Sequence, residues 1–162
     1  MNRLVRMLAA PRQARWLFNV YPPYLMTGIV VREISPDWRR VRVEMGLHWY
    51  NRNYFGTQFG GSLYAMTDPF YAIMLFRNLG PGYIVWDQGA EIDFLRPGKG
   101  RVRAEFVLDE DMLDEVRAAT REGKSCRPVW PVEVRDGEGE VVARVMKRLY
   151  ARRKAPVPPD RR

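Results

Sequence analysis

The sequence predicts an α+β domain in which an antiparallel sheet curves around a buried helix. Segments that alternate apolar and polar residues, as strands with one wet face do, occupy much of the chain. Between the second and third of these segments lies a run that is apolar on nearly every side at helical spacing, which is typical of a fully buried helix. Strands with polar outer faces need a partner for their inner faces, and that helix can provide it.

Length and composition favour one globular domain. A chain of 162 residues with 46% hydrophobic residues can bury a sizeable core but not two. No apolar run approaches the roughly 20 residues that span a bilayer, so we expect no membrane insertion. The single cysteine, Cys126, excludes an internal disulfide and a cysteine metal cluster, and no clustered ligands suggest a metal site. It fits a reducing compartment, so cytoplasmic localisation is expected.

The net charge of +8 is concentrated at the two ends of the chain. Residues 1–15 contain four arginines and no acid, and residues 151–162 contain five basic residues and one acid. The body between them is balanced. A globular nucleic-acid binder is expected to carry a basic stripe on its folded body, so we expect no nucleic-acid partner. The basic, Pro-rich tail over residues 151–162 is predicted to be disordered.

The chain is predicted to begin with a helical lead-in over residues 1–26. One or two short helices are expected there, broken at Pro11 and stopped by Pro22-Pro23, because proline lacks the N–H that a helix interior needs. The main domain is expected over residues 27–150. Its first two strands, at residues 27–35 and 39–47, form a hairpin around a Pro-Asp-Trp turn.

The second half of the chain carries the other strands and a surface helix. A long strand is predicted over residues 83–97, with one face made of Ile84, Trp86, Gln88, Ala90, Ile92 and Phe94. Gln88 would then be either a buried, hydrogen-bonded residue or part of a pocket lining. A helix over residues 109–124, capped by Asp109, separates a strand at 101–108 from two strands within 127–153.

The buried helix begins at Gly60-Gly61 and is interrupted at Asp68-Pro69. A carboxylate in an apolar helix is costly unless it has a partner or water. Two interpretations of Asp68 stay open. It can take part in chemistry, or it can cap a second helix beginning at Pro69, since proline favours the first helical position.

With this order of elements, the chain resembles the hotdog-fold acyl-CoA thioesterases over roughly residues 27–150. Asn53, the pair Gly60-Gly61 and Asp68 have the order and spacing of the phenylacetyl-CoA-type branch. The stretch FGGSLYAMTDPF also resembles less-characterised hotdog proteins that are assumed to be tetrameric acyl-CoA thioesterases. One departure is Phe59, where the phenylacetyl-CoA-type branch usually has histidine.

The resemblance implies a sheet wrapped around a long central helix. It also implies hydrolysis of acyl-CoA thioesters, with no cofactor other than the coenzyme A of the substrate. Active sites would form in a homodimer or a dimer of dimers. Two other functions stay open: a non-catalytic acyl or acyl-CoA binding module, which Phe59 favours, and a hydratase or dehydratase, for which the only histidine, His48, is poorly placed.

Three residues are predicted to carry the hydrolysis. The first turn of the buried helix offers unpaired N–H groups and a positive dipole end, and glycine lets a substrate approach them. We expect the Gly61 N–H to bind the oxyanion, and Asp68 to activate water or attack the carbonyl. Asn53 would hold the water or the thioester oxygen, or would only form a turn. The glycine pair could also be a helix entry with no ligand.

Further residues are predicted to bind substrate at the same entrance. Gly60 would shape the turn, Phe59, Gln58 and Ser62 would lie beside it, and Arg96 would meet a phosphate of coenzyme A. An aromatic group nearby could form core, interface or an acyl tunnel; it comprises Trp49, Tyr50, Tyr54, Phe55, Phe59 and Tyr64.

Overall fold

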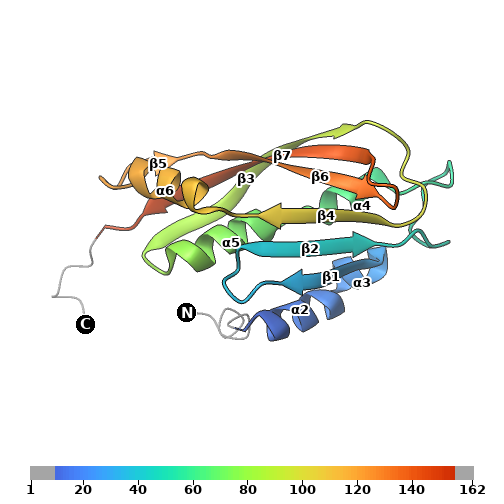
Figure 1. The fold of residues 1–162 in the computed structure, drawn as a ribbon, viewed down its shortest axis with the longest axis horizontal. Helices are drawn as coiled ribbons and strands as arrows, with labels where there is room; N and C mark the ends of the chain where they lie inside the picture. The colour runs from blue at the N-terminus through green and yellow to red at the C-terminus, as the bar shows by residue number, and fades with distance from the viewer. Residues whose placement is uncertain (1–9, 156–162) are drawn as a thin grey trace.

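The computed structural model describes residues 10–155 (Figure 1). The predictions for residues 1–9 and for the tail beyond residue 155 lie outside this range. The helices are α2 (Pro11–Val20), α3 (Pro22–Thr27), α4 (Gly60–Ala65), α5 (Phe70–Leu79) and α6 (Glu110–Ala119). The strands are β1 (Ile29–Ile34), β2 (Arg40–Met45), β3 (Tyr83–Phe94), β4 (Val102–Val107), β5 (Ser125–Cys126), β6 (Val129–Asp136) and β7 (Val141–Arg153).

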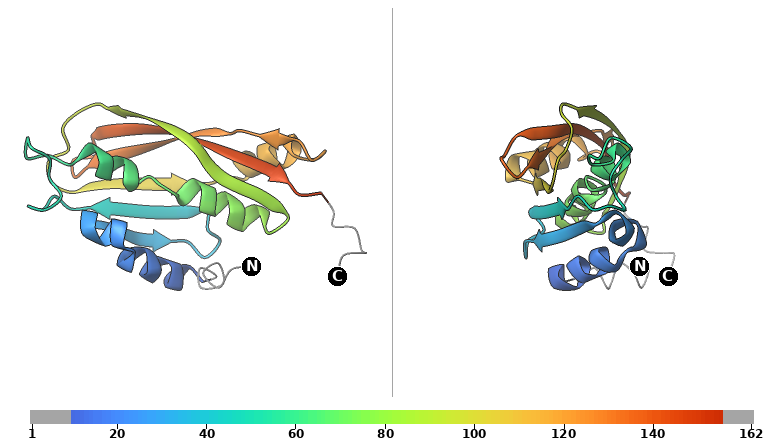
Figure 2. Two further views of the ribbon diagram at one scale, coloured as in Figure 1. Left: turned by 180° about the vertical axis from the view of Figure 1, so that it is seen from behind. Right: turned by 90° about the vertical axis from the view of Figure 1, so that its right-hand side faces the viewer.

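The strands form one antiparallel sheet of seven strands. Its order is β1-β2-β4-β6-β7-β3, and the short β5 pairs with β7. Figure 2 shows α4 and α5 end to end along one face of this curved sheet. The predicted α+β class is confirmed, as are the first hairpin, the long strand and the surface helix. β7 extends into the segment predicted as tail, up to Arg153.

The expected long central helix is two helices. α4 has six residues and α5 has ten, and the turn between them contains a cis peptide bond at Asp68-Pro69. Pro69 is itself the N-cap of α5, and no side chain caps that helix. The interpretation of Asp68 as a cap for a helix beginning at Pro69 is therefore wrong.

The predicted helix stop at Pro22-Pro23 is confirmed, since α2 ends at Val20, and the predicted break at Pro11 involves residues outside the described range. Both prolines also begin helices. Pro11 opens α2 and Pro22 opens α3, positions where the missing N–H costs nothing. α2 packs against β1, and the Asn19 side chain occupies the edge of that strand. Its Oδ1 accepts from the Val31 N–H at 2.8 Å, and its Nδ2 donates to the Val31 carbonyl at 3.2 Å. The lead-in thus covers one edge of the sheet.

The long strand β3 contains a β-bulge at Gln88. Asp87 pairs with Leu149 and Gly89 pairs with Arg148, so Gln88 is the extra residue. The bulge reverses the side-chain alternation, and the predicted single face from Ile84 to Phe94 is wrong. Gln88 is exposed, so the interpretation of Gln88 as a buried residue is wrong as well.

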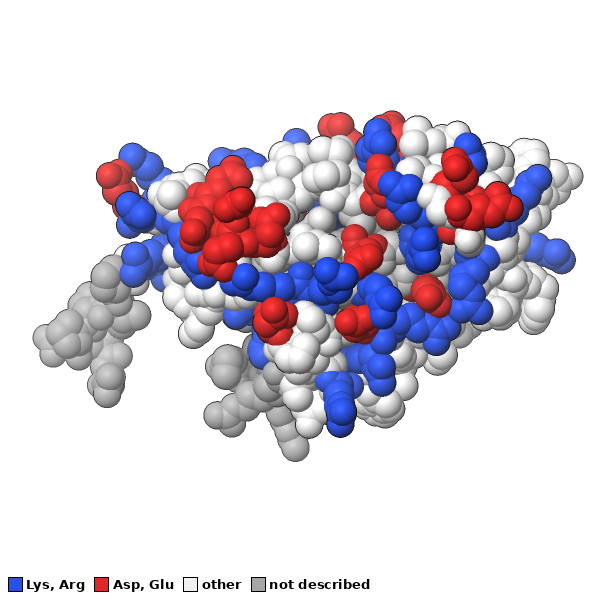
Figure 3. Space-filling view, in the orientation of Figure 1, with Lys and Arg blue, Asp and Glu red and all other residues white. Residues whose placement is uncertain are grey.

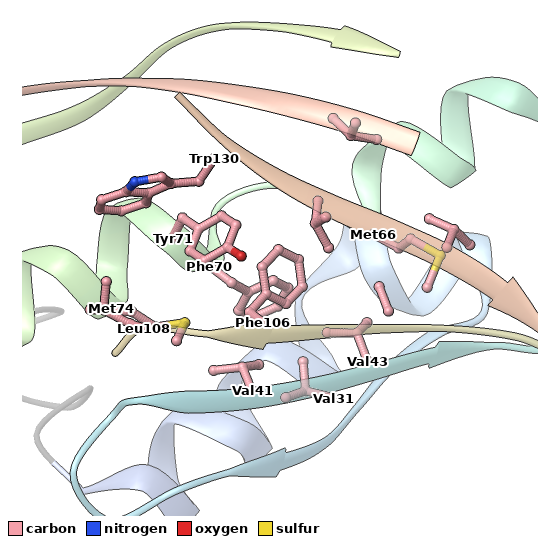
Figure 4. Packing of buried hydrophobic residues seen from close by; sticks show 14 of the residues in the cluster. Val31, Val41, Val43, Met66, Phe70, Tyr71, Met74, Phe106, Leu108 and Trp130 are labelled. Atoms are coloured by element: carbon pink, nitrogen blue, oxygen red, sulfur yellow. The ribbon is translucent and has the colours of Figure 1, made fainter. Parts of the chain in front are cut away.

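Aromatic rings join the buried helices to the sheet (Figure 4). The ring centroids of Phe70 and Phe106 lie 5.1 Å apart, and Tyr71 packs edge-on against Phe106 at 5.1 Å and against Trp130 at 5.4 Å. All four side chains are buried. This cluster fixes α5 against β4 and β6 and so sets where the helix pair lies.

The surface is charged and mixed in sign (Figure 3). Acidic side chains gather over α6, whose N-cap Asp109 accepts from the Met112 N–H at 2.8 Å as predicted. Ion pairs cross the outer face of the sheet, for example Arg40–Glu105 at 2.9 Å. Within residues 10–155, no helix is long and apolar enough to cross a membrane.

Phe106→Ala is expected to lower the free energy of unfolding by about 3–5 kcal/mol, because it removes a fully buried ring from the cluster that joins helix to sheet. Urea unfolding followed by far-UV circular dichroism measures this. Asp109→Ala, which removes only a surface cap, should cost about 1 kcal/mol and serves as the control. A loss from Phe106→Ala no larger than that of the control would contradict the role of the cluster.

Candidate active site

A groove of about 470 Å³ opens at the start of α4. It gathers four of the predicted site residues, Asn53, Gln58, Gly60 and Arg96. The rest of its lining is largely apolar and comes from the loop before α4, from α4 itself, from the end of β3 and from the loop after β3: Phe55, Thr57, Leu63, Phe94, Leu95, Pro97 and Gly98. A groove of this size and character suits an acyl chain or another partly apolar ligand.

Asn53 organises the turn in which it lies. Its Nδ2 donates to the Thr57 hydroxyl at 3.0 Å and to the Gln58 carbonyl at 3.2 Å. Its Oδ1 accepts from the N–H groups of Phe55 and Thr57 at 3.0 and 3.1 Å. These contacts support the predicted alternative in which Asn53 forms a turn. The predicted role in holding water or the thioester oxygen stays a prediction.

Gln58 is buried beneath the loop that follows β3. Its N–H donates to the Gly98 carbonyl at 2.9 Å, and its Nε2 donates to the Gly100 carbonyl at 2.9 Å. No described residue hydrogen-bonds to its Oε1. Gln58 therefore ties the two walls of the groove together. Arg96 lies at the outer lip, 3.3 Å from Glu140 across an exposed ion pair.

Gly60 and Gly61 occupy the first two positions of α4, where backbone N–H groups have no partner within the helix. Both glycines are closely covered. A Cβ on Gly60 would lie 2.9 Å from Phe94 Cζ, and a Cβ on Gly61 would lie 2.5 Å from Phe59 Cε1. The Phe59 side chain, 54% exposed, lies across the Gly61 backbone. Ser62 is buried within the first turn.

Asp68 lies at the joint between α4 and α5, and its carboxylate has a cationic partner. Oδ1 accepts a hydrogen bond from Lys147 Nζ at 3.0 Å, and the Asp68 side chain remains 45% exposed. Its main-chain carbonyl accepts from the hydroxyl of the buried Tyr24 on α3. Burial raises the pKa of Tyr24, so this hydroxyl stays a donor. The joint is thus fixed from two sides while the carboxylate reaches solvent.

Lys147, on β7, is the residue that sequence reasoning missed. Its side chain is 0% exposed, and its Nζ lies 3.1 Å from Asp87 Oδ1 and 5.3 Å from the centroid of the Tyr64 ring. Burial alone would lower the pKa of Lys147, but Asp87 and Asp68 outweigh it and leave that pKa raised. A signal was present in the sequence, because Lys147 alternates with Val145 and Leu149 and therefore points inward.

Asp87 is the enclosed partner of Lys147. Its side chain is 20% exposed, and the bulge at Gln88 is what allows Asp87 and Ala90 both to face inward. Burial raises the pKa of Asp87, Lys147 opposes that rise, and the Asp68 carboxylate adds to it. The net direction is upward, so Asp87 holds a proton more readily than an ordinary aspartate.

The groove and the Asp68 carboxylate are separate within one protomer. Asp68 follows the end of α4 at Ala65 and is not among the residues that line the groove, which lies at the start of that helix. The structure therefore brings Asn53, Gln58, Gly60 and Arg96 into one groove and leaves Asp68 at the far end of α4.

Other candidate residues lie outside this arrangement. The His48 ring stacks on Tyr50 with a centroid distance of 5.2 Å. Trp49, Tyr54 and Phe55 are largely exposed, so the core interpretation of these aromatic residues is wrong, and the interface and tunnel interpretations stay predictions. Within the part of the chain that the structure describes, no group of three or more His, Cys, Asp or Glu residues could hold a metal ion.

The family model described as a domain of unknown function, DUF4442, matches residues 11–151. The chain therefore belongs to the DUF4442 family. No curated protein matches it.

Several solved structures share the fold. PA5026 of Pseudomonas aeruginosa, a protein of unknown function described as a probable thioesterase, is similar with a TM-score of 0.76 and 22% identity, over 90% of this chain and 99% of its own. The thioesterase HI1161 of Haemophilus influenzae is similar with a TM-score of 0.63 and 15% identity, over 91% of this chain and 93% of its own. PaaI of the E. coli phenylacetic acid degradation operon is similar with a TM-score of 0.59 and 17% identity, over 89% of this chain and 92% of its own. The hotdog fold implied by the resemblance is confirmed.

Asp87→Asn is expected to change how stability depends on pH. Because the pKa of Asp87 is raised in the folded protein, the folded state binds a proton that the unfolded state releases. This makes stability fall as pH rises from the ordinary aspartate value of about 3.9 through the raised pKa. The variant lacks that loss, so its free energy of unfolding relative to wild type should increase across this window.

Urea unfolding at a series of pH values measures the difference between the two proteins. Asp111→Asn, at an exposed position of α6, is the matched control and should show no such trend. A difference for Asp87→Asn that stays constant or decreases as pH rises would contradict the assignment.

Proposed function

We propose that this protein hydrolyses acyl-CoA thioesters to a free acid and coenzyme A. The observation that carries the proposal is the Asp68 carboxylate, open to solvent yet held on a buried ammonium at the joint of the two buried helices. It occurs in a fold whose similar solved structures include named thioesterases.

The proposed chemistry uses Asp68 to generate or to be the attacking oxygen. As a base, it takes a proton from a water whose oxygen attacks the thioester carbon; as a nucleophile, it attacks that carbon itself. The carbonyl oxygen, now negative, accepts from the Gly61 N–H, and donors of this kind are worth about 3 kcal/mol of barrier. The intermediate then expels the coenzyme A thiolate, a good leaving group because thiols have a pKa near 8.5. On the base route the proton held by Asp68 passes to this thiolate, and on the nucleophile route water hydrolyses the remaining Asp68–acyl anhydride to release the free acid. Asn53 keeps the turn at this entrance in place.

Two protomers are needed for this chemistry. Because Asp68 lies beyond the end of α4 and the groove opens at the start of that helix, we expect that Asp68 and Gly61 of one protomer do not meet on one carbonyl group. We propose a homodimer, or a dimer of dimers, in which Asp68 of one protomer faces Gly61 of its partner. The proposed contact is β3, a twelve-residue strand that pairs only with β7 among the described strands and presents exposed Trp86 and Phe94. A long edge strand of this kind readily pairs with another.

The proposed substrate has an apolar acyl group and an anionic carrier. Leu63, Phe94 and Leu95 would contact the acyl part, with Phe59 and Ser62 beside it, and Arg96 at the lip would meet a phosphate of coenzyme A. No cofactor beyond this coenzyme A is required. The single cysteine fits a reducing compartment, so the proposed setting is the cytoplasm.

A second candidate is acyl-CoA binding without hydrolysis. It is favoured by the Phe59 ring, which lies 2.5 Å from the position that a Cβ on Gly61 would take, beside the proposed oxyanion donor. In that case an acyl-CoA would bind tightly and persist for hours.

Asp68→Asn is expected to reduce turnover by about 10²–10⁴-fold, because the base or nucleophile is lost. Release of free thiol from acetyl-, hexanoyl-, benzoyl- and palmitoyl-CoA measures the rate. Asp111→Asn is the control with the same change at an exposed site on α6 and should keep the wild-type rate. Undiminished turnover in a folded Asp68→Asn protein would contradict the mechanism, and a wild type that binds acyl-CoA without releasing thiol would favour the binding module.

A further inference from the structure

Lys147 is the one charged residue among the side chains that are buried in the described part of the chain. It stands on the inner face of β7 between the buried aliphatic residues Val145 and Leu149. Taking an ammonium out of water costs several kcal/mol, and replacing a buried ion pair by apolar residues is often neutral or stabilising. The core therefore does not need this charge, which points to a role outside core packing.

The groups around Lys147 Nζ come from three different elements. Asp68 lies on the joint after α4, Asp87 lies on β3, and the Tyr64 ring lies on α4. We call Lys147, Asp68 and Asp87 the Lys147 cluster. Tyr24 on α3 adds a further titratable group beside the cluster and donates its hydroxyl to the main-chain carbonyl of Asp68.

The two carboxylates of the Lys147 cluster have different surroundings. Asp68 is 45% exposed, whereas Asp87 is 20% exposed. One carboxylate can therefore meet a substrate, while the other can act only on Lys147 and Asp68. The bulge at Gln88 turns Asp87 toward the cluster, at the expense of regular pairing in β3.

We propose that Lys147 and Asp87 are positioning residues that control the Asp68 carboxylate. Lys147 orients Asp68 and keeps it ionised, and Asp87 offsets part of the ammonium charge so that Asp68 retains the basicity that proton abstraction requires. The proposal rests on the proposed function for its catalytic consequence, but its electrostatic content is independent of the substrate.

The cluster carries one positive and two negative charges when all three groups are ionised. With Lys147 alone, Asp68 would be a strongly paired and therefore weak base. With Asp87 alone, two carboxylates would face each other, and one of them would hold a proton near neutral pH. With Lys147 and Asp87 both present, Asp68 is neither paired with an uncompensated cation nor faced only by another carboxylate. Burial raises the pKa of Asp87, the more enclosed of the two carboxylates.

The test compares Lys147→Met, Asp87→Asn and the double variant by the pH profile of kcat/KM for thiol release from hexanoyl-CoA. Lys147→Met should move the acid limb upward by about one pH unit or more, because the two carboxylates lose their cation. Asp87→Asn should move it downward, because Lys147 then pairs with Asp68 alone. The acid limb of the double variant should lie between those of the two single variants. The double variant also leaves no unpaired buried ion, so it can be measured if Lys147→Met folds poorly.

The turnover of Lys147→Met should fall by about 10²-fold at the pH optimum of the wild type, with KM changed much less, as expected for a misplaced catalytic group. Lys124→Met, which removes an exposed lysine, is the control and should leave both constants unchanged. The proposal would be overturned if the acid limbs of the pH profiles coincide in the wild type and all variants. It would also be overturned if kcat and KM change by equal factors while the acid limb does not move.

A second measurement separates this proposal from the proposed function. Carbon-13 NMR of the aspartate carboxyl groups reports their ionisation without any substrate. Lys147→Met should move one of these titrations upward relative to wild type, and Asp87→Asn should move another downward. Titrations that stay unchanged overturn the proposal even if the wild type hydrolyses thioesters. Shifted titrations in a wild type that releases no thiol support it and contradict only the proposed function.

Discussion

The site depends on one buried charge, the ammonium of Lys147. Where no water reaches, an ammonium is stable only with anionic partners, so the chain has to deliver two carboxylates to it. Two local irregularities and one hydrogen bond meet this requirement. The buried helix is interrupted at Asp68, β3 contains a bulge next to Asp87, and Tyr24 donates to the Asp68 main-chain carbonyl. The two irregularities bring both carboxylates to the Lys147 ammonium, and the hydrogen bond holds the Asp68 main chain in place.

The same arrangement divides the site into two ends. The groove with Gly60 lies at one end of α4, and the Asp68 carboxylate lies beyond the other end. The aromatic cluster around Phe70 holds this helix pair against the sheet, so the separation is set by the core. In the proposed dimer, the Asp68 carboxylate of a second protomer would lie at the groove of the first, which overcomes the separation within one protomer. Among the described strands β3 pairs only with β7, whereas Asn19 of α2 covers the edge of β1, so the β3 edge is the one proposed to meet a second protomer.

Local periodicity was enough to predict the fold class, the first hairpin, the long strand and the capped helix at Asp109. Those features depend on residues close in sequence, such as the alternation of Val41, Val43 and Met45. The bulge at Gln88 was not predictable, since one extra residue leaves no local mark and is chosen by what lies across the sheet. Lys147 and Asp68 are 79 residues apart, and their pairing emerges only when β7 passes the helix joint. The alternation of residues in β7 could have shown that Lys147 points inward, but only the fold shows its partners.

The most direct test of the central claim is nitrogen-15 NMR of the lysine side chains near neutral pH, with Lys147 identified by its absence in Lys147→Met. An ammonium shielded from water and hydrogen-bonded to carboxylates exchanges its protons slowly. We expect a resolved, slowly exchanging Nζ signal for Lys147 that weakens in Asp87→Asn and in Asp68→Asn. A Lys147 signal that exchanges as fast as those of exposed lysines, or that reports a neutral amine, would contradict the account.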